Sequence, residues 1–169
     1  AELTGMAPIV RPVAAKAEII SPFLDRGAWG VQVPHVTTAA DARTVVDAVK
    51  YAPLGNRGLF GAGRAGDYGY RMNTAEYAEA ANRETLVCVM LEEVAAIDNL
   101  PELLAVPGID VFFIGSGDLS QSMGFTGQQT HPEVLKVMER GVKAITAAGR
   151  IAGCSCPDTH IPKFLDLGV

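Results

Sequence analysis

Five short runs along the chain are apolar almost throughout, and longer segments with helical spacing of their apolar residues separate them. The runs cover residues 8–11, 30–34, 86–91, 111–114 and 151–156. A strand whose two faces are both covered lacks the alternation of polar and apolar residues that a half-exposed strand has. The pattern therefore predicts five buried strands of a parallel sheet, joined by helices.

Residues that favour helix ends mark the boundaries of these elements. The clearest helix begins at His131-Pro132, with His131 as N-cap and proline at the first helical position, and its apolar residues 134, 138, 142 and 145 share one face. Thr38, followed three residues later by Asp41, predicts a second helix start. Four glycines each end a helix-like segment before an apolar run, as helix C-caps do: Gly27, Gly108, Gly149 and Gly168.

Five βα units fit either an open doubly wound sheet or part of a (β/α)8 barrel. The length of 169 residues suits one domain but falls short of the roughly 250 residues of a complete barrel. Length alone favours the open sheet, whereas polar residues at the ends of the strands favour a barrel. In both cases we expect a single domain over residues 1–169.

Composition and charge narrow the class of protein. Hydrophobic residues make up 49% of the chain and charged residues 20%, which supports a globular core. The net charge of -5 argues against a protein that binds the phosphates of nucleic acid. No apolar run approaches the roughly 20 residues of a membrane span, and the first residues lack the features of a signal peptide. We therefore expect a soluble, cytoplasmic protein.

The three cysteines indicate reduced thiols. Cys88, Cys154 and Cys156 cannot all pair with one another, and neither Cys nor His residues have the spacing of zinc ligands. Reduced cysteines within the strands or core are what we expect of a cytoplasmic protein.

One glycine-rich segment interrupts the βα rhythm. Residues 55–69 hold six glycines and two arginines, Arg57 and Arg64, in a stretch longer than an ordinary connection between a helix and a strand. The glycines do not follow a strand and open a helix, so they are a poor match to a dinucleotide-binding motif. Such a loop is typical of a functional or interface segment, and phosphate binding by either arginine is a minor alternative.

Each predicted strand ends in a polar residue. In chain order, the five runs have Arg11, His35, Glu92, Asp118 and Ser155 at or just beyond their ends. Because active sites of parallel βα folds lie at the carboxyl ends of the strands, these side chains are expected at one place.

Glu92 and Asp118 form a candidate metal site. They lie 26 residues apart, one βα unit, so their carboxylates come from successive strands. Two carboxylates with open positions suit Mg²⁺ or Mn²⁺ better than Zn²⁺. The alternative is that Asp118 caps the next helix, while Glu92 or Glu93 faces a helix dipole.

The remaining candidates are basic residues. Arg11, expected to be partly buried, needs an anion, which can be a protein carboxylate or a substrate. His35 can be a base, a metal neighbour or a hydrogen-bonded lining residue, whereas His160 has no identifiable partner.

Several segments together resemble the metal-dependent pyruvate aldolases of the HpcH/HpaI family. They are APIVRP, FLDRGAWGVQVPHVTTAADA, APLGNRG, CVMLEE and AIDNLPELLAVPGIDVFFIGSGDLSQSMG, then HPEV and AAGR, and the similarity runs from Ile9 to the end of the chain. The most specific piece is GIDVFFIGSGDLSQSMG, in which Ser116-Gly117 replaces the Pro-Ala that is common in the family.

The resemblance implies a (β/α)8 TIM barrel of which this chain supplies roughly strands 3 to 7 and, at Gly168-Val169, the start of strand 8. It implies reversible cleavage of a 4-hydroxy-2-oxo acid to pyruvate and an aldehyde. Glu92 and Asp118 would hold a divalent metal (Mg²⁺, Mn²⁺ or Co²⁺), and Arg11 would bind and polarise the keto acid. Backbone amides of Ser116, Gly117 and Asp118 would hold the pyruvate carboxylate, with Ser155 beside them.

The resemblance also implies a contribution from another subunit. The loop that carries the family's catalytic His would precede Ala1, so the chain is either part of a longer one or a truncated product. Asp25 matches the catalytic partner of that His but is predicted at a helix C-terminus, at the opposite end from the strand carboxyl ends. It would therefore serve a neighbouring subunit in a homo-oligomer, a hexamer built as a trimer of dimers.

Two alternatives to the aldolase remain open. A lyase of the citrate lyase beta type would act on a coenzyme A thioester and would need a basic patch, which the charge of -5 does not suggest. A truncated paralogue would bind pyruvate or a metal without catalysis. For the aldolase, the aldehyde half is expected to be loosely specified, because His35 and the glycine-rich segment are the only candidates to bind it.

Overall fold

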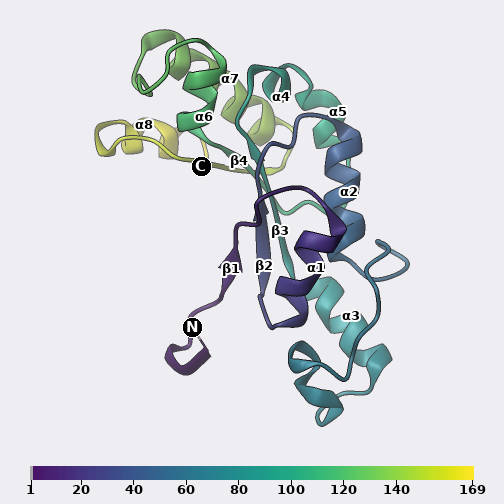
Figure 1. The fold of residues 1–169 in the computed structure, drawn as a ribbon. Helices are drawn as coiled ribbons and strands as arrows, with labels where there is room; N and C mark the ends of the chain where they lie inside the picture. Colours follow the sequence, from purple (N-terminus) through teal and green to yellow (C-terminus); the bar gives the residue numbers. More distant parts are fainter. Residues whose placement is uncertain (1) are drawn as a thin grey trace.

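The computed structural model describes residues 2–169 and contains one parallel sheet of five strands (Figure 1). Each predicted run contains one strand, so the positions of all five are confirmed. Their burial is confirmed for the inner strands, whereas the first and last strands are partly exposed, with Ile9 at 43% and Ile151 at 62% exposure, so the expected burial is wrong there. The strands are β1 (Ile9–Val10), β2 (Gly30–Val33), β3 (Leu86–Leu91), β4 (Val111–Ile114) and β5 (Ile151–Cys154).

The order of the strands decides between the two architectures. Neighbouring strands follow chain order, β1-β2-β3-β4-β5, and every pairing is parallel. A doubly wound sheet reverses its order at a switch point, whereas a barrel adds each strand beside the previous one. The sheet is therefore part of a barrel-type fold, and the open sheet favoured by length is wrong. Val169 is in no strand, and the start of a further strand at Gly168-Val169 stays a prediction.

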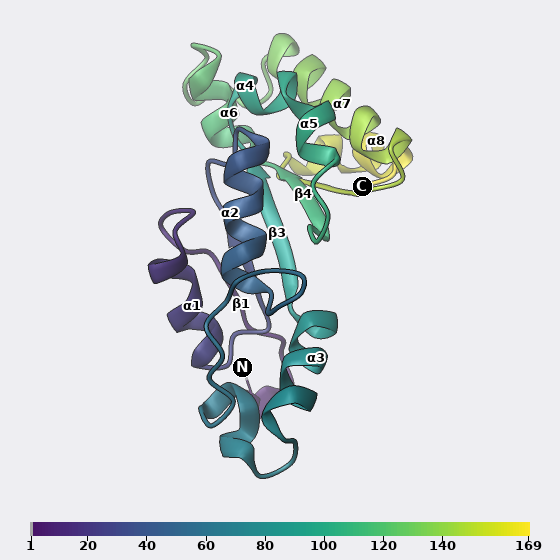
Figure 2. The ribbon, with the colours of Figure 1, turned by 90° about the vertical axis from the view of Figure 1, so that its right-hand side faces the viewer.

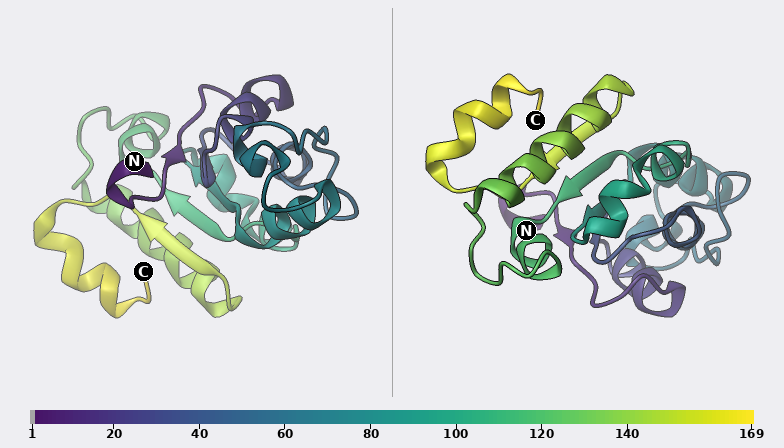
Figure 3. Two further views of the ribbon diagram at one scale, coloured as in Figure 1. Left: turned by 90° about the horizontal axis from the view of Figure 1, so that it is seen from below. Right: turned by 90° about the horizontal axis from the view of Figure 1, so that it is seen from above.

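Helices follow the strands in the expected alternation. They are α1 (Ala17–Asp25), α2 (Ala39–Val49), α3 (Thr74–Glu84), α4 (Val94–Asp98), α5 (Leu100–Leu104), α6 (Ser116–Ser122), α7 (Pro132–Ala147) and α8 (Ile161–Asp166). Short 3-10 helices cover Glu2–Thr4, Arg64–Gly69 and Asp158–His160. Helix α2 packs on α1 and β3 (Figure 2), and α7 runs beside β5 (Figure 3). No helix in residues 2–169 is long and apolar enough to cross a membrane.

The two predicted helix starts and three of the four predicted helix ends are confirmed. Thr38 and Asp41 form a reciprocal capping box at the start of α2, and the His131 side chain accepts a hydrogen bond from the amide of Glu133 at the start of α7. The four predicted C-cap glycines all have positive φ, between +69° and +99°. Gly27, Gly149 and Gly168 directly follow the C-cap residues of α1, α7 and α8, and glycine allows this left-handed backbone without a steric penalty. Gly108 lies three residues beyond Ala105, the C-cap of α5, so its prediction as a helix C-cap is wrong.

The core lies between the sheet and the helices packed on it. The four apolar residues of α7 that were expected to share a face are fully buried. They contact a continuous cluster that includes residues of β2, β3 and β4. This packing fixes the strand ends, and with them the loops that carry the polar residues.

The three thiols are unpaired, as expected. Burial raises the pKa of Cys88 to about 12, so this thiol is neutral at neutral pH.

Candidate metal and substrate site

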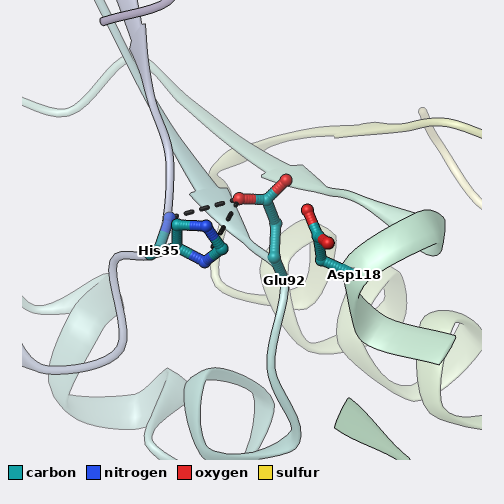
Figure 4. A group of neighbouring side chains, drawn as sticks. All are labelled: His35, Glu92 and Asp118. Atoms are coloured by element: carbon teal, nitrogen blue, oxygen red, sulfur yellow. Dashed lines mark hydrogen bonds and ion pairs between the residues drawn. The ribbon is translucent and has the colours of Figure 1, made fainter. Parts of the chain in front are cut away.

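Three side chains converge at the carboxyl ends of β2, β3 and β4 (Figure 4). His35 lies two residues after β2, Glu92 directly after β3, and Asp118 in the first turn of α6. One ligand atom from each lies within 4.8 Å of the others. The predicted meeting of Glu92 and Asp118 is confirmed. His35 lies beside both carboxylates and also lines the neighbouring pocket, so its three possible roles stay predictions.

Backbone hydrogen bonds hold the loops around this group. The amide of Val36 donates to the Met90 carbonyl (3.2 Å), and the amide of Gly115 donates to the Leu91 carbonyl (3.3 Å). The amide of His35 donates to Glu92 Oε2 (3.2 Å), with His35 itself in the left-handed region at φ 56°. These bonds join the ends of three neighbouring strands and aim the Glu92 carboxylate across the sheet edge.

Gly115 leaves the space that Glu92 occupies. A Cβ atom at this position would lie 2.9 Å from both Cγ and Oε1 of Glu92, closer than real Cβ contacts. A larger residue would push the carboxylate out of its place. Glycine is therefore needed at this position because a side chain would not fit beside Glu92, and not because of its backbone freedom.

The two carboxylates lack a compensating positive charge. Glu92 is only 3% exposed, and its partners are the amide of His35 and the His35 ring at 3.8 Å. Asp118 is half-buried and makes no hydrogen bond or ion pair, and within residues 2–169 no Lys or Arg pairs with either carboxylate. Because a buried carboxylate needs a partner, this donor set fits a divalent cation with oxygen ligands.

The alternative role as a helix cap is wrong for Asp118, whereas Glu93 does stand at the start of the next helix, as that alternative allowed. Gly115 is the N-cap of α6, and Asp118 is the third residue of that helix. Glu93, rather than Glu92, is the N-cap of α4, and its side chain makes no capping bond. Glu93 instead places Oε1 at 3.3 Å from Nδ1 of His35.

A pocket of about 530 Å³ opens beside the carboxylates. Its lining combines His35 and Asp118 with Glu93, Val94, Ala95, Gln121 and Ser122. Gln121 and Ser122 were not predicted from the sequence. Helical spacing could have found Gln121, because it lies three residues after Asp118 and so on the same face of α6.

Arg11 follows β1 but is exposed, so the expected partial burial is wrong. Among residues 2–169 it has no hydrogen-bond or ion-pair partner, and it is neither in the carboxylate group nor in the pocket lining. The protein carboxylate considered as its partner is therefore absent from the described chain. Its role toward a keto acid stays a prediction.

Ser116 and Ser155 contact each other. The amide of Ser116 donates to Ser155 Oγ (3.0 Å), and the two hydroxyls are 3.1 Å apart. This contact joins the end of β5 to the start of α6. Because the Ser116 amide already has an acceptor, binding of a pyruvate carboxylate there requires Ser155 to share or give up this bond. The substrate roles of Ser116, Gly117 and Ser155 stay predictions.

Asp25 lies at the other end of the sheet. It is the last residue of α1, and the chain then enters β2, so it sits at the amino ends of the strands as expected. Its Oδ1 accepts a 2.6 Å hydrogen bond from Nη2 of Arg57, whose side chain is 2% exposed and whose guanidinium lies 4.7 Å from the centroid of the Tyr51 ring. Arg57 is committed to this internal pair, so a phosphate-binding role for it is wrong.

Comparisons with known proteins place the chain in a family. The model of the HpcH/HpaI aldolase/citrate lyase family matches residues 1–166. A 2-keto-3-deoxy-L-rhamnonate aldolase of Klebsiella pneumoniae is 42% identical over 147 residues, 86% of this chain and 54% of the relative. A hydroxypyruvate/pyruvate aldolase of Cupriavidus necator is 40% identical over 163 residues, 95% of this chain and 60% of the relative.

Solved structures agree with this placement. The crystal structure of an HpcH/HpaI aldolase from Desulfitobacterium hafniense matches with a TM-score of 0.90 and 30% identity, covering 100% of this chain and 65% of that one. The chain belongs to the HpcH/HpaI aldolase/citrate lyase family. It spans between 54% and 60% of the length of these two curated relatives.

Proposed function

We propose that this protein catalyses the reversible, metal-dependent cleavage of a 4-hydroxy-2-oxo acid to pyruvate and an aldehyde. The observation that carries the proposal is the pair formed by buried Glu92 and half-buried Asp118, which have no Lys or Arg partner within residues 2–169. Relatives about 40% identical that are named as aldolases of keto acids support the same reaction.

In this proposal Glu92 and Asp118 hold Mg²⁺, Mn²⁺ or Co²⁺ through carboxylate oxygens. When bound, such a cation stabilises the negative charge that develops on the keto oxygen as the carbon-carbon bond breaks. Arg11 binds the keto acid with its planar guanidinium, for which the exposed and unpartnered side chain is available. The start of α6, with Ser155 beside it, receives the pyruvate carboxylate.

Asp25 has a role between subunits in this proposal. At the amino end of the strands it is remote from the carboxylate pair of its own chain, whereas its carboxylate is about one third exposed. We propose that it serves the site of a neighbouring copy in a homo-oligomer, a hexamer built as a trimer of dimers. The three free thiols fit the reducing cytoplasm, where we place the protein.

The test is the metal dependence of pyruvate release in the intact protein. With a 4-hydroxy-2-oxo acid as substrate, EDTA should abolish pyruvate release and added Mn²⁺ should restore it. Glu92→Gln and Asp118→Asn should stay inactive after metal is restored. Full activity of either variant after stripping and reloading would overturn the assignment.

Two other functions are distinguished by the same preparation. Turnover of a malyl or citramalyl thioester without turnover of free hydroxy-oxo acids would identify a coenzyme A lyase instead. A folded protein that binds Mn²⁺ and pyruvate but releases no product would identify a non-catalytic paralogue. Neither is favoured, because the relatives at about 40% identity are named as aldolases of keto acids.

A further inference from the structure

The pocket beside the carboxylate pair offers polar groups to the part of the substrate that has no assigned partner. One wall comes from the loop after β2, with His35, and another from the start of α4, with Glu93. The third is the α6 face that carries Gln121 and Ser122. Asp118 belongs both to this lining and to the carboxylate pair, so the pocket is continuous with the proposed reaction centre.

The lining has hydrogen-bonding capacity that the described chain does not use. Gln121 is exposed and its amide makes no hydrogen bond within residues 2–169, so it offers both donors and an acceptor. Ser122 Oγ accepts from the amide of Val94 (3.0 Å) and keeps its own hydrogen to donate. Val94 and Ala95 are the apolar residues of the lining, so it offers surface to an alkyl chain beside these polar groups.

The charge of the lining distinguishes neutral from anionic ligands. A divalent cation would neutralise Glu92 and Asp118, which leaves Glu93 as the remaining carboxylate. Glu93 has a side chain 41% exposed and lies 3.3 Å from His35 Nδ1. A second carboxylate entering the pocket would meet a like charge, whereas a hydroxyl would meet hydrogen-bond partners.

We propose that Gln121 and Glu93 determine which aldehyde is used: Gln121 selects aldehydes with a hydroxyl beside the carbonyl, and Glu93 disfavours aldehydes that carry a carboxylate. This inference rests on the proposed aldolase function. It also replaces the expectation that the aldehyde half lacks identifiable binding groups.

Aldol addition is the direction in which this choice is measured. A methyl C–H bond of pyruvate breaks and its proton goes to a base. The electron pair forms the new bond to the aldehyde carbon, and the aldehyde oxygen takes up a proton to become the 4-hydroxyl. The exchange of pyruvate methyl protons for deuterium reports the first half of this step and needs no aldehyde.

The experiment compares matched aldehydes with the intact, Mn²⁺-loaded protein. Glycolaldehyde and acetaldehyde differ by one hydroxyl, and succinic semialdehyde and butanal differ by charge at equal length. We expect kcat/KM to favour glycolaldehyde about tenfold, the size of one useful hydrogen bond, and Gln121→Leu to remove most of that preference. Glu93→Gln should raise kcat/KM for succinic semialdehyde roughly threefold relative to butanal, the size of one screened charge contact.

Controls carry the same chemical changes on exposed residues outside the pocket. They are Gln128→Leu in the loop after α6 and Glu79→Gln on α3, and both should keep the parent ratios. Deuterium exchange is measured for every variant, and Gln121→Ala replaces Gln121→Leu if the latter does not fold. No exchange in the parent protein refutes the proposed function and this inference with it. Exchange together with aldehyde ratios that do not differ between the pocket and control variants refutes this inference alone.

Discussion

Replacing Glu92 with Gln should stabilise the metal-free protein while abolishing its response to metal. The ligand atoms of Glu92 and Asp118 lie no more than 4.8 Å apart. Two unit charges at that distance repel by about 0.9 kcal/mol in a water-like dielectric and about 3.5 kcal/mol at an effective dielectric of 20. Glu92 is buried and Asp118 half-buried, so the true value lies between these limits. The amide oxygen of Gln can still accept from the His35 amide, so little is lost in exchange.

Thermal unfolding of the intact protein in EDTA measures this effect. For a domain of this size 1 kcal/mol moves Tm by about 2–4 °C, so Glu92→Gln should melt between about 2 and 14 °C above the parent. Adding Mn²⁺ at about 100 times its Kd should stabilise the parent by about 2.7 kcal/mol. The variant should gain almost nothing, because it lacks one of two charged ligands.

A matched control separates this effect from a general loss of negative charge. Glu79→Gln changes an exposed residue of α3 and should leave Tm and the response to Mn²⁺ unchanged. If Glu92→Gln melts below the parent in EDTA, the two carboxylates do not repel each other in the folded protein. If it keeps the full stabilisation by Mn²⁺, Glu92 is not a metal ligand, and the argument from uncompensated charge fails.

Three further predictions concern single residues elsewhere in the chain. Arg11→Lys should lower kcat by about 10²–10³-fold, the loss expected when one stabilising donor is removed from a reaction centre. Tm should stay unchanged, because Arg11 is exposed and has no partner within residues 2–169. An active but unstable variant would contradict this. Asp25→Asn removes the negative charge beside the buried Arg57 and should cost about 1–3 kcal/mol in thermal unfolding. Asp98→Asn breaks an exposed ion pair and should cost less than about 1 kcal/mol. Equal costs would refute the distinction. Burial raises the pKa of Cys88 from its ordinary 9.0 to about 12. The unfolded chain therefore loses this proton first, and the free energy of unfolding should fall as pH rises from 9 to 12. Urea titrations at several pH values should show that Cys88→Ala reduces this pH dependence.

The fold was largely predictable because its signals are local. Continuous apolar runs, a capping box at Thr38 and glycines such as Gly149 each report the conformation of a few neighbouring residues, and these elements were confirmed. The choice between an open sheet and a barrel was not local, because it depends on which strands lie side by side. The resemblance to a known family predicted the barrel, and the order of the strands agrees with that prediction.

The site was predictable in part for the same reason. Glu92 and Asp118 could be paired because successive parallel strands end at the same edge. His35 joins the two carboxylates because its left-handed backbone brings its amide to Glu92. A single sequence does not specify that backbone conformation. The exposure of Arg11 and the pairing of Arg57 with Asp25 depend on packing between distant segments, so sequence patterns gave the first wrongly and missed the second.

The three converging residues each belong to a different βα unit. The residues proposed to hold the metal and the residue proposed to choose the aldehyde can therefore mutate independently. Glu92 comes from the loop after β3, while Gln121 lies on the exposed face of α6, one helical turn beyond Asp118. A change at Gln121 alters no residue of the metal-holding pair and no buried contact of the sheet. Under the proposed function, substitutions on one short helix would change which aldehyde is accepted while the residues that hold the metal stay the same.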